Sequence, residues 1–458
     1  MFDRSKITTE SRQMLKLAAP AVVAQLAQMS MGTIDTIMSG QLSTEALAAI
    51  SVANNLVIPL IILVLGVLMA LNPMVSHAMG AQKTERVSDY TRQGLYIAVF
   101  MTVPCFFLIP LADPMMEFIG VEESIRPVVL EYLLALRWGL ISLNLFFAVR
   151  FVNEGLFSTD AIMYISLAAI PFNIGLNFVF MYGYFGIPAY GAVGLGYATS
   201  IVWTLMFISI ATFTLVTKRY KDIEFLNGFH WPQLTIIKEI LALAVPLSLT
   251  LFLEVLMFAS VGLLIGRYAL EVIAAHQIAL NITSVIYMVP LGLSIAVSAR
   301  VGRAFGRHNL MDCRLSAYLG IAFAVMFGII TTIILLTLSE YIVSVYTDSA
   351  DVIHKTLGLL SIAVVFLIVD SIQVITASAL RGLQDTFVPM IIAAITYWLI
   401  GFSTGYYLAE IMGMKAEGYW YGFVAGLASA SVLMFWRLQK LFKRLDQIDA
   451  GEPLHVDS

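Results

Sequence analysis

The chain has 458 residues, of which 60% are apolar and only 12% are charged, whereas a soluble domain carries roughly 45–50% apolar and 25% charged residues. The net charge is −4 and Lys and Arg form no dense run, which argues against a nucleic-acid partner. About a dozen helical spans of roughly 20 residues each would use most of this length. The composition therefore predicts an all-α integral membrane protein with no room for a folded enzyme domain outside the membrane.

Twelve apolar runs are long enough to cross a bilayer as helices. In chain order they occupy about 14–37, 50–76, 94–112, 128–152, 161–183, 191–216, 239–265, 273–298, 315–338, 355–378, 386–409 and 417–437. Each run is continuously apolar, which indicates a helix and not the alternating strand of a barrel. The first run is longer than the apolar core of a signal peptide, so we expect it to remain as the first span.

The positions of Lys and Arg predict the orientation of these spans. Of the 26 basic residues, 21 fall on one side of the predicted membrane, and Arg137 is the only one well inside a run. Because basic loops stay in the cytoplasm, we predict that both termini are cytoplasmic. An even number of spans agrees with this orientation.

The two halves of the chain are homologous. Aligning 15–80 with 241–306, without gaps, gives 17 identities in 66 positions, where composition alone would give roughly five. Six spans per half is an even number, so the halves enter the membrane in the same direction. The predicted organisation is an N-terminal six-helix lobe (1–216), a cytoplasmic linker (217–238), a C-terminal six-helix lobe (239–437) and a cytoplasmic tail (438–458).

A pair of lobes with parallel repeats has a natural cavity between them that can open to either side of the membrane. This architecture predicts transport. Three acids stand inside predicted spans: Asp35 in the first, Glu254 in the seventh and Asp370 in the tenth. A charged side chain near the bilayer centre costs about 2.5–3.5 kcal/mol. Any one of them can be structural, for instance paired with Arg137, but three acids in so uncharged a chain indicate a functional set.

Glu254 and Asp370 belong to the same half, where two carboxylates can hold a dehydrated cation between them. A sodium ion or a proton would neutralise such a pair, and we predict a cation-coupling site there, with a sodium site at Glu254 and Asp370 as one form of it. Tyr287 in the eighth span is either an aromatic contact for the cation or an ordinary packing residue. We add Asp35 and Tyr287 to the coupling set.

Amide side chains accompany Asp35. Gln28 precedes Asp35 by seven residues, about two helical turns, and so lies on the same helical face. Asn173 and Asn177 are four residues apart and share a face of the fifth span. Such amides either hydrogen-bond a carboxyl group or join helices to one another. The predicted substrate cavity contains Gln28, Asp35, Asn173, Asn177 and Tyr287.

Five sequence blocks carry a resemblance to a known family. They are LKLAAPAVVAQLAQMSMGTIDTIMSG (15–40), ALNPMVSHAMGA (70–81), LTLFLEVLMFASVGLLIG (249–266), SIAVSARVGRAFG (294–306) and SALRGLQDT (378–386). In this order they resemble the multidrug and toxic compound extrusion (MATE) family, in its NorM-type bacterial branch. The resemblance covers essentially the whole chain.

The resemblance implies a secondary active antiporter of the bacterial inner membrane that exports small cationic amphipathic drugs in exchange for sodium ions or protons. In NorM-type relatives, a carboxylate in the position of Asp35 functions in the first lobe. Carboxylates in the positions of Glu254 and Asp370 contribute to the cation site, and Tyr287 matches an aromatic residue that contacts the cation. A further family acid matches Asp348 or Asp351, which are otherwise expected to cap a helix. Archaeal relatives have an Asn and an Asp where this chain has Asn173 and Asn177, so their proton mechanism does not transfer directly.

Other predictions concern partners and alternatives. We expect a monomer with membrane lipids around it and no cofactor apart from the coupling ion. A flippase for lipid-linked saccharides, from the same wider superfamily, is the alternative function, but it would need basic residues in the cavity and Arg137 is the only base deep in a span. HExxH, GxSxG, Walker A and clustered His/Cys motifs do not occur in the sequence, which argues against a membrane enzyme.

Overall fold

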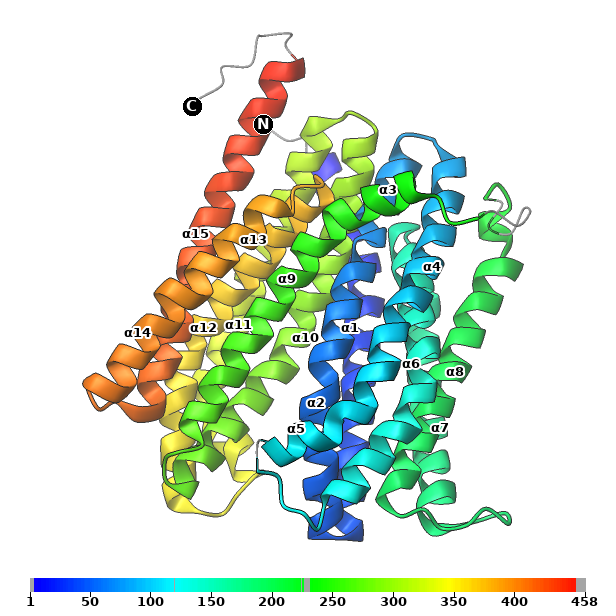
Figure 1. The fold of residues 1–458 in the computed structure, drawn as a ribbon. Helices are drawn as coiled ribbons and strands as arrows, with labels where there is room; N and C mark the ends of the chain where they lie inside the picture. The colour runs from blue at the N-terminus through cyan, green and yellow to red at the C-terminus, as the bar shows by residue number, and fades with distance from the viewer. Residues whose placement is uncertain (1–3, 119, 224, 226–230, 450–458) are drawn as a thin grey trace. The chain divides into compact units, whose positions relative to one another are not determined.

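The computed structural model describes residues 4–118, 120–223, 225 and 231–449. Within these residues all regular elements are helical and there are no strands (Figure 1). In this described part of the chain, twelve helices are long and apolar enough to cross a membrane. The predictions of an all-α membrane fold and of twelve spans are confirmed.

The first half of the chain forms six spans, some built from two or three consecutive helices. Its elements are α1 (Arg4–Leu42), α2 (Thr44–Met69), α3 (Leu71–Gly80), α4 (Thr84–Leu108), η1 (Ile109–Leu111), α5 (Ala112–Phe118), α6 (Arg126–Gly155), α7 (Asp160–Tyr182), α8 (Ala192–Val216) and the short η2 (Lys218–Tyr220). The second half also forms six spans. Its elements are α9 (Leu234–Ile265), α10 (Leu270–Gly306), α11 (Leu310–Ser344), α12 (Ala350–Gly382), α13 (Phe387–Ala394), η3 (Ile395–Phe402), α14 (Ser403–Tyr406), η4 (Tyr407–Ile411) and α15 (Lys415–Asp449).

Most helices extend beyond the apolar runs that predict them. The run 14–37 lies within a helix that begins at Arg4, and the predicted tail is helical as far as Asp449, with 450–458 outside the described residues. The predicted linker contains η2 and the start of α9, and its residues 224 and 226–230 are also outside the described part. Apolar runs mark only the hydrocarbon region, whereas backbone hydrogen bonds continue a helix through polar residues.

The chain forms two compact units. Unit 1 contains Met1–Val22 and Leu249–Ser458, and unit 2 contains Val23–Ser248. The two division points, after Val22 and after Ser248, are equivalent positions of the sequence repeat that aligns 15–80 with 241–306. Helices α1 and α9 therefore each begin in one unit and continue into the other.

A glycine allows the close helix contact at each of these division points. A Cβ added to Gly66 of α2 would lie 2.6 Å from the Ser248 Cα, and a Cβ added to Gly292 of α10 would lie 2.7 Å from the Val22 backbone nitrogen. Gly66 and Gly292 are themselves equivalent positions of the repeat. Ser248 adds a hydrogen bond from its hydroxyl to the Leu63 carbonyl at 2.8 Å. Both repeats thus use the same backbone contact.

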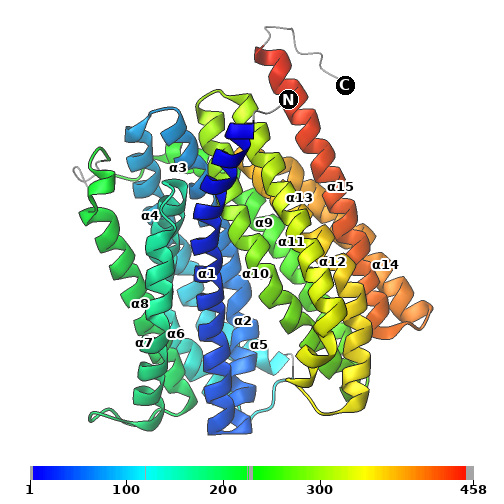
Figure 2. The ribbon, with the colours of Figure 1, turned by 180° about the vertical axis from the view of Figure 1, so that it is seen from behind.

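In unit 1, α10 packs against α11 and α12, and α15 packs against α12 (Figure 2). The span 387–411 departs from regular α-helix because η3 and η4 are π-helical. Wide turns of this kind occur often at functional sites. Tyr397, which is fully buried, lies in the first of them.

The expectation that Asp348 and Asp351 cap a helix is wrong. The residue before α12 is Ser349, whose side chain makes no capping hydrogen bond, and Asp351 lies inside the first turn. An acid in the first turn still interacts favourably with the positive end of the helix dipole.

Candidate functional site

Asp35 is the centre of a polar cluster in unit 2. Its side chain is 8% exposed. Oδ1 accepts hydrogen bonds from the side-chain amides of Asn173 at 3.1 Å and Asn177 at 2.7 Å, and Oδ2 accepts one from the Thr199 hydroxyl at 3.2 Å. Burying a carboxylate is costly in free energy unless it is hydrogen-bonded. The three donors from α7 and α8 therefore stabilise the buried Asp35 side chain.

A cavity of about 270 Å³ lies beside Asp35. Residues of α1, α2, α6, α7 and α8 line it, among them Met31, Tyr132, Phe147 and Trp203. Asp35 is the only charged residue among those that the structure describes at its wall. Ligand pockets in proteins are mostly apolar, with a few polar groups that orient the ligand, and have volumes of about 300–1,000 Å³. At about 270 Å³, this cavity has the same kind of lining and a volume just below that range.

Gln28 lines the same cavity but does not bind Asp35. Its amide donates to the Ser166 hydroxyl at 3.1 Å, and its carbonyl oxygen accepts from Arg150 at 2.9 Å. Arg150 is 2% exposed and forms an ion pair with Glu154 at 2.8 Å. Arg150, near the end of α6, is therefore buried within the protein beside a carboxylate partner that neutralises it.

Glu254 of α9 and Asp370 of α12 lie close together in unit 1. Asp370 is buried, Glu254 is half-buried, and their charges are near enough to interact. Tyr287 of α10 lies near both acids. The structure thus brings together three of the residues that the sequence assigns to cation coupling.

Two further residues join this acid pair. Gln373 donates from its amide nitrogen to the Tyr397 hydroxyl at 2.8 Å, and the Tyr397 hydroxyl approaches Glu254 Oε2 at 3.5 Å, the outer limit of a hydrogen bond. Gln373 stands about one helical turn after Asp370 and so shares its helical face, a signal that the sequence analysis missed. Nothing in the sequence pattern marks Tyr397.

The arrangement can hold a small cation through oxygen atoms. Among the described residues, no group of three or more His, Cys, Asp or Glu side chains is placed to hold a metal ion. Gln373 Oε1 is buried and has no hydrogen-bond donor in the described part of the chain. Together with two carboxylates it supplies the oxygen ligands that hard cations prefer.

Other predicted groupings are divided between the two units. Asp35 belongs to unit 2, whereas Glu254 and Asp370 belong to unit 1. Tyr287 also lies in unit 1 and is not among the described residues that line the cavity of unit 2. Asn177 hydrogen-bonds Asp35 but is not among the described residues that line the cavity, whereas Asn173 lines it.

Comparison with known proteins identifies the family. A family model described as MatE matches residues 20–179 and 246–407, two segments that begin at equivalent positions of the repeat. The chain belongs to the MatE family. The resemblance to MATE proteins that the sequence blocks carry is thereby confirmed.

Several proteins are similar to this MatE-family chain over nearly its full length. A protein of Idiomarina loihiensis named "Probable multidrug resistance protein NorM" is 36% identical over 450 residues, which is 97% of each chain. The solved structure of an outward-facing multidrug resistance MATE transporter has a TM-score of 0.88 at 19% identity, covering 96% of this chain and 97% of that one. The eukaryotic MATE transporter AtDTX14 has a TM-score of 0.87 at 17% identity, covering 96% and 99%.

Proposed function

We propose that the protein is a secondary active exporter of small cationic amphipathic compounds, driven by exchange for sodium ions or protons through alternating access. The observation that carries this proposal is the buried Asp35 carboxylate at the wall of a largely apolar cavity of about 270 Å³. A lipophilic cation satisfies both features, because its charge meets the carboxylate and its rings pack against aromatic and methionine side chains. The small volume favours compact compounds.

The pair Glu254 and Asp370 is the proposed coupling site. Two acids that repel each other bind a cation more favourably than either acid alone, and Gln373 Oε1 offers a neutral oxygen ligand. A sodium ion would be held by these oxygens, whereas a proton would be carried by one carboxyl group. The sequence contains no nucleotide-binding motif, so we propose that an ion gradient drives export. Binding of the cation on one side of the membrane and its release on the other would couple the gradient to drug export.

The relatives support the same activity. One is named a multidrug resistance protein and two solved structures are named MATE transporters. From these names and the spans we propose a monomeric protein of the bacterial inner membrane, surrounded by lipid, with both termini in the cytoplasm and no enzymatic activity. A flippase for lipid-linked saccharides is less favoured, because no Lys or Arg occurs among the described residues that line the cavity in unit 2.

Transport by the purified full chain in liposomes tests the proposal. Vesicles loaded with a fluorescent lipophilic cation are exposed to a jump in external sodium, or in external acidity, and dye efflux is followed. We expect at least one gradient to accelerate efflux. Glu254→Gln and Asp370→Asn should each reduce that acceleration at least about tenfold, because the amide keeps the shape of the side chain but loses the charge that holds the ion.

The matched control is Glu340→Gln, which removes an exposed acid of unit 1. It should leave the response to both gradients intact. Efflux indifferent to both gradients in the unmodified protein would refute antiport, and an unchanged response in both acid-pair variants would refute the coupling site. Movement of a phosphate-linked saccharide lipid without movement of the dye would favour the flippase.

A further inference from the structure

Arg137 of α6 stands inside a span, and neither of the two proposed sites uses it. It follows the first residue of α6 (Arg126–Gly155) by eleven positions, which is about 16 Å along the helix axis. The helix is about 45 Å long, whereas the hydrocarbon core of a bilayer is about 30 Å thick. In the proposed orientation α6 begins outside the cytoplasm, so Arg137 lies in the outer half of the membrane.

Two aromatic rings contact the guanidinium group of Arg137. Its Cζ lies 4.5 Å from the centre of the Phe106 ring, on α4, and 5.3 Å from the centre of the Trp138 ring. The two rings also meet each other edge to face, with their centres 5.3 Å apart. Trp138 is 62% exposed. The group therefore lies on a surface of unit 2 that the rest of the chain leaves uncovered.

These rings do not replace hydrogen-bond acceptors. An aromatic ring attracts a guanidinium charge, but it is at most a weak acceptor for N–H groups. Arg137 Nε is buried and has no acceptor within the described part of the chain, and Arg137 forms no ion pair with a described carboxylate. A charged group with unsatisfied N–H donors is costly in hydrocarbon. An acceptor from outside the chain would therefore stabilise Arg137.

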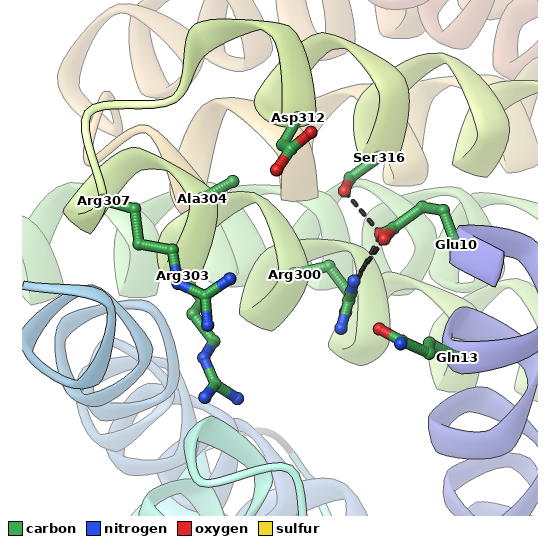
Figure 3. A pocket seen from close by; sticks show the side chains of 8 residues that line it. All are labelled: Glu10, Gln13, Arg300, Arg303, Ala304, Arg307, Asp312 and Ser316. Carbon is green, nitrogen blue, oxygen red and sulfur yellow. Dashed lines mark hydrogen bonds and ion pairs between the residues drawn. The ribbon is translucent and has the colours of Figure 1, made fainter. Parts of the chain in front are cut away.

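Two other arginines of the spanning helices have carboxylate partners. Arg150 forms an ion pair with Glu154 at 2.8 Å. Arg300 Nε donates to Glu10 at 2.8 Å, in a cavity of about 280 Å³ that residues of α1, α10 and α11 line (Figure 3). Both lie closer to an end of their helix than Arg137 does. The arginine that is deepest in its span is thus the one without a carboxylate among the described residues.

The equivalent helix of the second half has no arginine at this position. When Gly155, at the end of α6, is aligned with Gly382, at the end of α12, Arg137 corresponds to Val364. Valine is an ordinary apolar residue of a spanning helix, so the shared plan of the two halves does not require a charge here. Arg137 is a feature of the first half only, which indicates a role for its charge.

We propose that Arg137 binds the phosphate group of an anionic phospholipid in the outer leaflet. A guanidinium fork offers parallel N–H donors to two phosphate oxygens, and opposite charges attract strongly where water is scarce. Side chains on a helix tilt toward its N-terminus, which directs Arg137 toward the outer headgroups, and a bilayer thins locally around an intramembrane arginine. The exposed rings of Trp138 and Phe107, both beside Phe106, offer a surface to the acyl chains.

The experiment compares two lipids that share their acyl chains. The thermal unfolding of the detergent-purified full chain is measured against increasing concentrations of dioleoylphosphatidylglycerol, or of dioleoylglycerol, which lacks the phosphate. Phosphatidylglycerol should raise the unfolding temperature at concentrations at least about tenfold lower than dioleoylglycerol does. Arg137→Gln should remove this difference between the two lipids, because it removes the charge and the fork that bind the phosphate.

Two further variants keep the test decisive. Arg126→Gln removes a charge from the first turn of the same helix, where Arg126 pairs with Glu117 at 3.5 Å, and should respond like the unmodified protein. Arg137→Lys keeps the charge without the fork and should weaken the response to phosphatidylglycerol at least about threefold, which decides the matter if the Gln variant does not fold. Equal responses to both lipids in the unmodified protein, a full difference in the Arg137 variants, or an equal loss in Arg126→Gln would overturn the proposal. The readout is lipid binding, so it is independent of the proposed transport activity.

Discussion

Single residues distinguish the two acidic sites. The carboxylate of Asp35 accepts hydrogen bonds on both oxygens from three neutral side chains, so the surrounding protein compensates its charge. Glu254 and Asp370 instead lie near each other, and only Tyr397 approaches Glu254 within the described hydrogen bonds. Because its hydrogen bonds stabilise the charge of Asp35, this carboxylate can remain ionised both with and without a cationic ligand. The two neighbouring carboxylates of Glu254 and Asp370 repel each other and are stabilised when a cation binds between them.

The first prediction concerns the charge of Asp35. In Asp35→Asn, the affinity for a lipophilic cationic dye should fall at least about tenfold, because the attraction between opposite charges in a site of low dielectric is lost. A neutral dye of the same shape should bind equally well to both proteins. Fluorescence titration of the purified protein measures both affinities. Asp160→Asn, which changes an exposed acid of the same unit, is the control. Equal losses for both dyes would show that Asp35 only maintains shape.

The second prediction concerns Tyr220, which lies outside the spans. Burial raises the pKa of its hydroxyl to about 12, and the hydroxyl donates to Asn153 Oδ1 at 2.8 Å. Since the folded pKa exceeds the ordinary value near 10, the stabilisation is complete below about pH 10 and is lost as the pH rises through 12.

Tyr220→Phe should therefore be less stable than the unmodified protein at neutral pH, by about 0.5–1.5 kcal/mol for the lost hydrogen bond. The difference should narrow as the pH rises above 10. Thermal unfolding at a series of pH values measures it. A difference that stays constant through this range would contradict the assignment of the titration to Tyr220.

At the scale of helices, glycines determine how closely the last two spans of unit 1 approach. Gly418, Gly422 and Gly426 recur every fourth residue on one face of α15 and meet Ala409, Gly405 and Gly401 of the π-containing span. A Cβ added to Gly422 would lie 2.5 Å from the Gly405 Cα. Small residues at this spacing allow helices in a membrane to pack backbone against backbone. The close contact supports the wide turns that carry Tyr397.

The third prediction follows from this contact. Gly422→Ala should lower the unfolding temperature, because the added methyl group collides with backbone atoms that cannot move aside, an effect of about 1–3 kcal/mol. Gly262→Ala, in α9 of the same unit, meets no atom within 4 Å and should be neutral or slightly stabilising. Thermal unfolding in detergent compares the two. Similar unfolding temperatures for the two variants would show that α15 can move away from the neighbouring span without loss of stability.

At the scale of the whole molecule, the two halves share a plan but not a chemistry. In both halves, a glycine at the same repeat position packs closely against a helix that begins the other half of the sequence. Gly292 contacts α1 at Val22, and Gly66 contacts α9 at Ser248. In the alignment of the halves, Asp35 corresponds to Val261 and Glu254 to Gln28. The acids have therefore diverged, as expected if the proposed ligand site lies in one half and the proposed coupling-ion site in the other.

The fourth prediction concerns membrane orientation. Reporter domains fused after Arg444 and inserted next to Arg219 should be active only when the reporter functions in the cytoplasm, because basic residues gather at both sites. A reporter inserted at Asp348, in the loop just before α12 and on the opposite predicted side, should show the reverse. Activity of a periplasmic reporter at Arg444 or Arg219 would refute the proposed orientation.

The amino-acid sequence by itself determined the class of the protein, the number of spans, the repeat and the identity of the three intramembrane acids. Hydropathy is a property of each run of residues, so the twelve runs needed no tertiary information. The repeat is visible in the sequence because both halves keep the same residues at tight contacts, such as Gly66 and Gly292. The amides Asn173 and Asn177 were recognised by their helical spacing alone.

Tertiary structure alone decided which side chains meet. It brought Thr199 to Asp35 and Tyr397 to Gln373, buried Arg150 beside Glu154, and divided α1 at Val22. The physical reason is that lipid tails are as apolar as a protein interior, so a spanning helix need not show a polar face opposite its packed face. Without that contrast, sequence periodicity does not reveal how each helix is rotated or where it crosses its neighbours, and only the packed helices determine both.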